Sequence, residues 1–325
     1  MNSREVVRRT FEFSYPERVA HSFHPTDFTW CGVHIPGTQY QWKRVGERQW
    51  TRVDEWGNIW QRSDCESRGK KIKGGLHEIT ESANFTFPDF SNQAYYLTTK
   101  TAFEEFPDKW HIALLSGSTF EIANALLDNY TNAVYTDRKD IQILHDRIDS
   151  VLKIQILKFK ECGADSVMIV EDLAGTFQLP PGPELWREEF KPRLSAICDY
   201  AHSLGLSVII HCLEETSFVK DHIEAGADCI EIDTPQTVGI DALKVLQESY
   251  PVTFWCPVDI NTTLQTKNEE IIRKSAHEML DKLWRGRGGF IAGYYWDNVS
   301  LGLSPEWQFY ATDEFIRYGK AAYYR

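Results

Sequence analysis

Acidic, histidine and cysteine residues recur in this sequence directly after short runs of β-branched and apolar residues. In the run GLSVIIHC, a glycine suited to ending a helix precedes a strand-like segment that stops at His211 and Cys212. The run SVMIVED ends in the same way, at Glu171 and Asp172. Parallel α/β enzymes carry their chemistry at the carboxyl ends of strands, so these residues are the first candidates for a functional site.

Two more runs end in side chains that can move protons or bind metals: CIEIDT leads to Asp233, and VTFWCPVD carries Cys256 and Asp259. Imidazole, carboxylate and thiolate groups also bind zinc, and ligands from different strands can meet at a barrel mouth. A candidate metal set is therefore His211, Glu171 and Cys256. The candidates for acid–base catalysis are Glu171, Asp172, His211 and Asp259.

Each of these candidates also has a purely structural explanation. A histidine at a strand end often only holds a hydrogen bond, and Asp259 can cap the turn that follows it. Cys212 and Cys256 fit plain buried thiols. The functional interpretation therefore depends on several strand ends meeting at one rim.

Aromatic side chains accompany the last two strand-like runs. Trp255 precedes Cys256, and the segment FIAGYYWD supplies Tyr294, Tyr295 and Trp296. Aromatic residues form the apolar walls of small-molecule pockets, where they contribute large contact areas. We assign these four residues to substrate binding.

The elements that must position these residues alternate between strand and helix. Strand-like runs begin about 20–40 residues apart, which is the length of a β-α-β unit. We expect one further strand within residues 69–92, completing a (β/α)8 TIM barrel that residues 1–325 form as a single domain. The recognisable runs are FTWCGV, HIALLSGS, SVMIVED, SVIIHC, CIEIDT, VTFWCPVD and FIAGYY.

A different pattern separates the first two of these runs. Residues 39–64 alternate in period two around turns at Gly46 and Gly57, which predicts an antiparallel N-terminal β-hairpin flap on the barrel. The flap is rich in tryptophan, which covers either an edge of the core or the substrate as a lid. Its tryptophans are Trp42, Trp50, Trp56 and Trp60.

Composition limits the possible partners. The formal net charge of −12 argues against a general nucleic-acid or anionic-membrane surface. Seven scattered cysteines, an odd number, indicate reduced thiols rather than a disulfide framework. The charged N-terminal segment is unlike a signal peptide, and no apolar run reaches membrane-spanning length. We expect a cytoplasmic protein with a small-molecule substrate.

Longer segments carry a resemblance over nearly the whole chain. In order, they are SREVVRRTFEFSYPERV, VDEWGNIW, GADSVMIVEDLAGTF, ELWREEFKPRLSAICDYAHSLGLSVIIHC, AGADCIEIDTPQTVGID and FWCPVD. Together they resemble the uroporphyrinogen decarboxylase superfamily. The resemblance implies a (β/α)8 barrel and one of two chemistries. These are cofactor-free decarboxylation of uroporphyrinogen, and methyl transfer involving a corrinoid protein, usually with zinc.

The sequence departs from both branches of this superfamily. The decarboxylases carry an arginine-rich RQAGR loop for their acidic substrate, whereas the corresponding segment here, HSFHPTDFTWCGVHIPGTQY, contains no arginine. The zinc methyltransferases have a His-x-Cys pair and a late cysteine. Here His211 is followed two residues later by Leu213, and no cysteine follows Cys256.

The chemistry most compatible with these features is that of the methyltransferase branch. We expect transfer of a methyl group from a small, methoxyaromatic or other methylated donor to a corrinoid protein, with His211 and Glu171 as metal ligands or acid–base groups. Two alternatives stay open. One is a decarboxylase or other lyase that acts on a smaller acid, and the other is a non-catalytic binding barrel.

Overall fold

The computed structural model describes residues 1–35, 42–63, 69–171, 182–212, 218–298 and 301–324. Its main element is a sheet of eight parallel strands, in the order β1-β12-β11-β10-β9-β8-β7-β2. The strands are β1 (Ala20–His21), β2 (Phe28–Gly32), β7 (Trp110–Leu114), β8 (Ser166–Glu171), β9 (Ser207–Cys212), β10 (Cys229–Ile232), β11 (Thr253–Cys256) and β12 (Phe290–Ala292).

This sheet curls until its two end strands, β1 and β2, lie near each other. One buried cluster inside the curl takes a side chain from every strand, and Phe28 of β2 stacks on Trp255 of β11 with ring centroids 4.7 Å apart. The strand members of the cluster are Ala20, Phe28, Trp110, Ile112, Met168, Ile209, Cys229, Trp255 and Ile291. The architecture is therefore that of a TIM-barrel-like α/β fold.

The expected place of the eighth strand was wrong. Within residues 69–92 the structure forms β6 (Lys70–Lys73), which belongs to a different sheet. The eighth parallel strand is β1, which has only two residues and pairs Ala20 with Ile291 of β12. A strand this short leaves no alternating pattern in the sequence.

Helix α1 (Ser3–Phe11) covers the amino ends of the strands. Its buried Val6 and Val7 join the inner cluster, and the Arg4 N–H donates to the carbonyl of Asp108, just before β7. The other helices are α2 (Leu97–Glu105), α3 (Thr119–Leu126), α4 (Tyr130–Thr136), α5 (Arg138–Glu161), α6 (Gly182–Leu185), α7 (Lys191–Ser203), α8 (Val219–Glu224), α9 (Pro235–Val238), α10 (Ile240–Ser249), α11 (Glu269–Met279) and α12 (Glu306–Tyr318).

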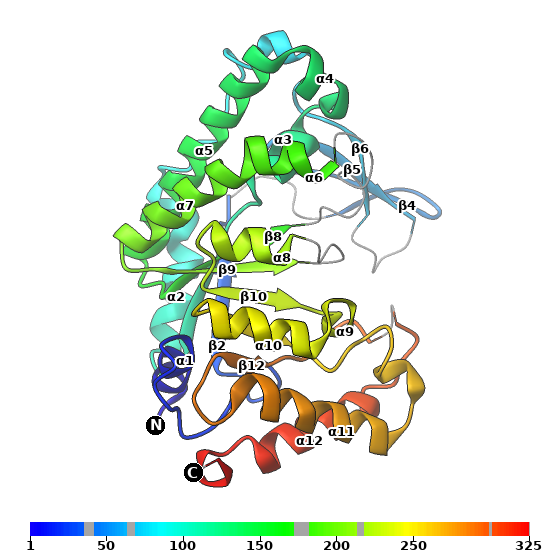
Figure 1. Cartoon of the computed structure of the whole chain (residues 1–325). Coiled ribbons are helices and arrows are strands. Elements are labelled where there is room, and N and C mark those ends of the chain that lie inside the picture. Colours follow the sequence, from blue (N-terminus) through cyan, green and yellow to red (C-terminus); the bar gives the residue numbers. More distant parts are fainter. Residues whose placement is uncertain (36–41, 64–68, 172–181, 213–217, 299–300, 325) are drawn as a thin grey trace.

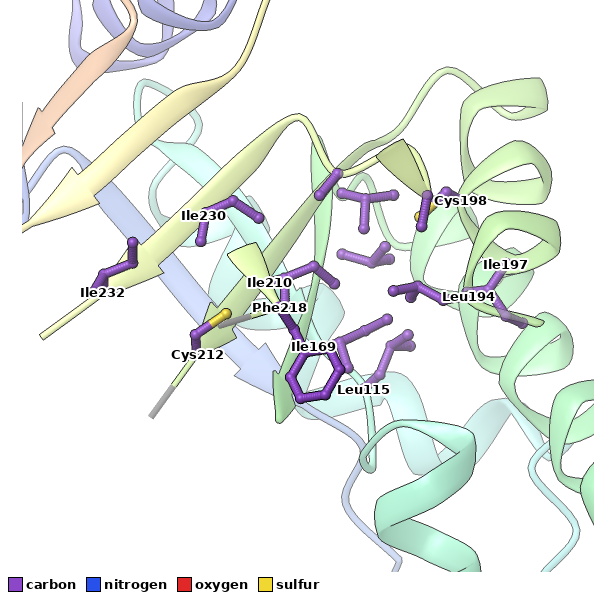
Figure 2. Close-up of a cluster of buried hydrophobic side chains, with 14 of the residues drawn as sticks. Leu115, Ile169, Leu194, Ile197, Cys198, Ile210, Cys212, Phe218, Ile230 and Ile232 are labelled. Atoms are coloured by element: carbon purple, nitrogen blue, oxygen red, sulfur yellow. The ribbon is translucent and has the colours of Figure 1, made fainter. Parts of the chain in front are cut away.

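A larger apolar core lies between the strands and these helices. Figure 2 shows Ile210 and Cys212 of β9 in the same layer as Leu194 and Ile197 of α7. Because side chains alternate along a strand, the intervening residues of β9 must point to the inside of the curl. This alternation decides which strand-end residues can share a site. None of the helices in the described part of the chain is both long and apolar enough to cross a lipid bilayer.

Four short antiparallel strands form a second sheet: β3 (Lys43–Gly46), β4 (Gln49–Val53), β5 (Ile59–Arg62) and β6. The period-two pattern therefore corresponds to antiparallel strands, although the sheet has four members and not the two of a single hairpin. Figure 1 shows it on the side toward which β8, β9 and β10 point. Its role as a flap over a substrate stays a prediction.

Candidate functional site

The inside of the curl opens into a pocket of about 260 Å³ at the carboxyl ends of the strands. Its lining combines aliphatic, aromatic and acidic side chains with one histidine. The lining residues are Ser22, Trp30, Ile112, Leu114, Met168, Val170, His211, Glu231, Trp255, Tyr294 and Trp296. A pocket of this size suits a small molecule rather than a macrocycle.

His211 lies between two carboxylates from the neighbouring strand and the loop that follows it. Its Nε2 is 3.0 Å from Oδ2 of Asp233, and its Nδ1 is 3.6 Å from Oε2 of Glu231. In the sheet register His211 pairs with Glu231, which pairs in turn with Trp255 of β11. The three side chains can each offer a donor atom within 4.8 Å of the other two.

Two carboxylates so close together carry an electrostatic cost. The pKa of Glu231 is raised to about 7: burial raises it most, the charge on His211 lowers it, and the charge on Asp233 raises it. Protonation of Glu231 or a bound cation would relieve this repulsion. The cluster is thus acidic, and its residue types are those that can bind a proton or a metal ion.

Ser22 holds the aromatic wall in place. The Trp255 Nε1–H donates to Ser22 Oγ at 3.3 Å, and the backbone N–H of Tyr294 donates to the same oxygen at 3.1 Å. Tyr294 and Trp296 are in ring contact, with centroids 4.8 Å apart. Trp30 and Trp296 are 40% and 58% exposed, so they form the outer part of the pocket.

The structure does not bring the candidate metal set His211, Glu171 and Cys256 together. Glu171 and Cys212 are register partners on the opposite face of β8 and β9, where both contact His222. Cys256 is fully buried and belongs to the outer core, because the neighbouring Trp255 occupies the inner face of β11. Alternation along the strands separates these residues from His211.

The remaining candidates have different surroundings. Asp259 is buried and accepts hydrogen bonds from the backbone N–H groups of Gln236, Asn261 and Thr262, at 3.0, 3.1 and 2.8 Å, so it caps these turns. Tyr295 is held through its backbone by Gln308 and does not line the pocket. Asp172 lies outside the described residues. Of the predicted residues, the pocket includes His211, Trp255, Tyr294 and Trp296.

Glu231 is the site residue that sequence reasoning missed. A usable signal was present, because Glu231 and Asp233 stand two residues apart in CIEIDT and therefore project to the same side of a strand. Their proximity to His211 depends on the pairing of β9 with β10, which places Glu231 directly beside His211. The sequence itself does not specify that register.

The resemblance implies zinc, and the residues of this cluster fit such an ion. One imidazole and two carboxylates are all zinc ligands, and three protein ligands are the number that holds catalytic zinc while leaving a position open for substrate. The donor atoms already lie close together, and the two negative charges favour a divalent cation. The residues that would hold it are His211, Glu231 and Asp233.

Comparisons with known proteins identify a family and similar solved structures. Residues 76–318 match the family described as uroporphyrinogen decarboxylase (URO-D). A methyltransferase from Methanosarcina mazei superposes with a TM-score of 0.61 and 14% identity, covering 97% of this chain and 85% of that chain. A 3-keto-L-gulonate-6-phosphate decarboxylase from Vibrio cholerae gives a TM-score of 0.35 and 9% identity, covering 67% of this chain and 78% of that chain. A search of curated proteins finds no match. Because the family match spans most of the sequence, the chain belongs to the uroporphyrinogen decarboxylase family.

Proposed function

We propose that this protein is a methyltransferase that takes a methyl group from a small donor and passes it to a corrinoid protein. Family membership and the structural similarity to the M. mazei methyltransferase support the reaction class. The observation that carries the proposal is the His211–Glu231–Asp233 cluster, which lies beside an aromatic pocket of small-molecule size.

The pocket suits a methoxyaromatic or similarly methylated donor. Trp255, Tyr294 and Trp296 offer faces against which an aromatic ring can stack, and Met168 and Val170 line the pocket with apolar surface. These walls would orient the methyl group and keep water from it. His211 and Glu231 line the same pocket, so the atom that loses the methyl group can lie next to them.

Zinc held by His211, Glu231 and Asp233 would supply Lewis-acid polarisation of that leaving atom. The chain's own contribution is to fix the ligands. Asp233 contacts one nitrogen of the His211 ring and Glu231 lies beside the other, so the two acids hold the ring at the pocket, and zinc would replace the contact at the nitrogen that it binds. Metal binding requires Glu231 to lose its proton, and we expect zinc affinity to fall as the pH drops below about 7.

Decarboxylation of an acidic substrate is less compatible with the site. Among the described residues that line the pocket there is no lysine or arginine. A substrate with many carboxylates needs such cations and would also be repelled by Glu231 and Asp233. The pocket thus favours a neutral or cationic donor over uroporphyrinogen.

The test is methylation of reduced cobalamin by a panel of methoxyaromatic and other methylated donors, with demethylated product measured in parallel. We expect at least one donor to react, and His211→Ala to lower the rate at least 100-fold. His202→Ala is the matched control, since His202 also pairs with a carboxylate, Asp228 at 2.8 Å, but does not line the pocket. Carbon dioxide release without methyl transfer would contradict the proposal.

A further inference from the structure

A second histidine–carboxylate pair lies directly behind His211. Glu171 and Cys212 face each other across the β8–β9 pair, and His222 of α8 inserts between them. The His222 Nε2 is 2.6 Å from Glu171 Oε2, and its Nδ1 is 3.5 Å from Cys212 Sγ. One imidazole therefore connects the last residues of two adjacent strands to a helix.

This network is sealed from solvent. Glu171, Cys212 and His222 are 3%, 1% and 0% exposed, and Trp186 packs edge-on against the His222 ring at 5.1 Å. In the described part of the chain the structure records no lysine or arginine beside Glu171. A buried carboxylate without a partner is costly, so Glu171 requires His222. Its burial gives the network a structural role rather than direct contact with a substrate.

The network lies one residue from the proposed centre. His211 directly precedes Cys212 and points to the opposite face of β9, while its register partner on β8, Val170, directly precedes Glu171. A shift of these strand ends would move His211 relative to Glu231 and Asp233 on the neighbouring element. Metal sites lose affinity when groups that orient a ligand are removed.

We propose that Glu171 and His222 are positioning residues for His211. They fix the carboxyl ends of β8 and β9 against α8, and thereby hold the His211 ring in the geometry of the pocket. The consequence for zinc rests on the proposed function, but the consequence for the orientation of His211 does not.

The test uses the full-length protein labelled with ¹³C at histidine ring Cε1 and the variants Glu171→Gln, His222→Gln and Cys212→Ala. The His211 signal is assigned by its loss in His211→Gln. We expect it to move in Glu171→Gln and in His222→Gln, and zinc affinity, measured by competition with a chromophoric chelator, to fall about tenfold in both. Cys212→Ala, which removes only the longer contact, should have a smaller effect on both measurements.

Glu189→Gln is the matched control. It disrupts another histidine–glutamate pair, the buried His145 with the half-buried Glu189 at 2.9 Å, which joins α5 to the segment before α7 and does not line the pocket. An unmoved His211 signal in a folded Glu171→Gln protein whose His222 signal has moved would overturn the proposal. If His222→Gln does not fold, the result for Glu171→Gln alone tests the positioning role. If the wild type binds no zinc, the ¹³C signal of the His211 ring alone tests it. Failure of the metal site and failure of the positioning role are therefore distinguishable.

Discussion

The buried position of Glu231 disfavours the charged form of its carboxyl group. Burial and the nearby Asp233 raise its pKa in the folded protein from 4.5 to about 7. The protonated form is therefore favoured by folding, and this contribution to stability is complete below pH 4.5 and lost as the pH rises through about 7. At higher pH the apoprotein must keep a destabilising charge in the pocket.

Replacement of Glu231 by glutamine removes that charge. We expect Glu231→Gln to raise the free energy of unfolding of chelator-treated protein above pH 7 by up to about 3 kcal/mol, and to change it much less near pH 4.5. Urea denaturation at the two pH values measures the difference. The same stability change at both would show that the charge of Glu231 is not responsible.

His222 is also buried, but here burial and the neighbouring groups shift the pKa in opposite directions. Burial alone would lower its pKa, but its interactions with Cys212 and with the Glu171 carboxylate raise it to about 10. Since 10 exceeds the ordinary value of 6.5, the stabilisation is complete below pH 6.5 and is lost as the pH rises through about 10.

The His222→Ala substitution should therefore be strongly destabilising at low pH. It leaves Glu171 buried without a partner, and we expect a loss of about 3–5 kcal/mol in the free energy of unfolding near pH 6.5. Urea denaturation of the wild type and the variant should show this difference shrinking as the pH approaches 10. A pH-independent difference would assign the effect to lost packing instead.

At the scale of elements, Asp259 is a residue near a strand end whose carboxylate stabilises the neighbouring turns by accepting hydrogen bonds from their backbone. It accepts hydrogen bonds from residues on both sides, Gln236 of α9 and Thr262 beyond β11. We expect Asp259→Asn to lower the free energy of unfolding by about 1–3 kcal/mol and to leave zinc affinity within about twofold. Chemical denaturation and chelator competition measure the two effects. A large loss of zinc affinity with unchanged stability would return Asp259 to the list of catalytic candidates.

The predictability of each element depended on its length. The runs that became β8 and β9 could be identified from the sequence, because each is long enough to show a continuous strand-like pattern. The strand β1 has only two residues, so its sequence shows no alternating pattern. Its place next to β12 is set by the pairing of Ala20 with Ile291 in the folded sheet. The eighth strand was consequently sought in the wrong segment.

The sequence predicted which strand ends carry candidate site residues, but not which of those residues face the same pocket. His211, Trp255, Tyr294 and Trp296 were chosen because they follow apolar runs, and they do line one pocket. Glu171 and Cys256 follow similar runs but lie on the other face, and the sequence does not show how neighbouring strands align. A shift of one residue reverses which side chains meet, so tertiary register decides the membership of the site.

At the scale of the whole molecule, the fold places an acidic cluster beside an aromatic pocket at the carboxyl ends of the strands of a curled sheet. A second sheet lies on the same side (Figure 1). In the proposed function, the acidic cluster would bind a cation and the aromatic wall would bind an apolar donor, as methyl transfer from a small molecule requires. The proposed function therefore depends on whether the cluster of His211, Glu231 and Asp233 binds a metal ion.

The most direct measurement is the metal content of protein purified without chelator, compared with His211→Ala and His202→Ala. We predict about one divalent ion per chain in the wild type and in His202→Ala, and almost none in His211→Ala. Wild-type protein that takes up no zinc, or zinc that stays bound in His211→Ala, would contradict the assignment of His211, Glu231 and Asp233 as the centre of this protein.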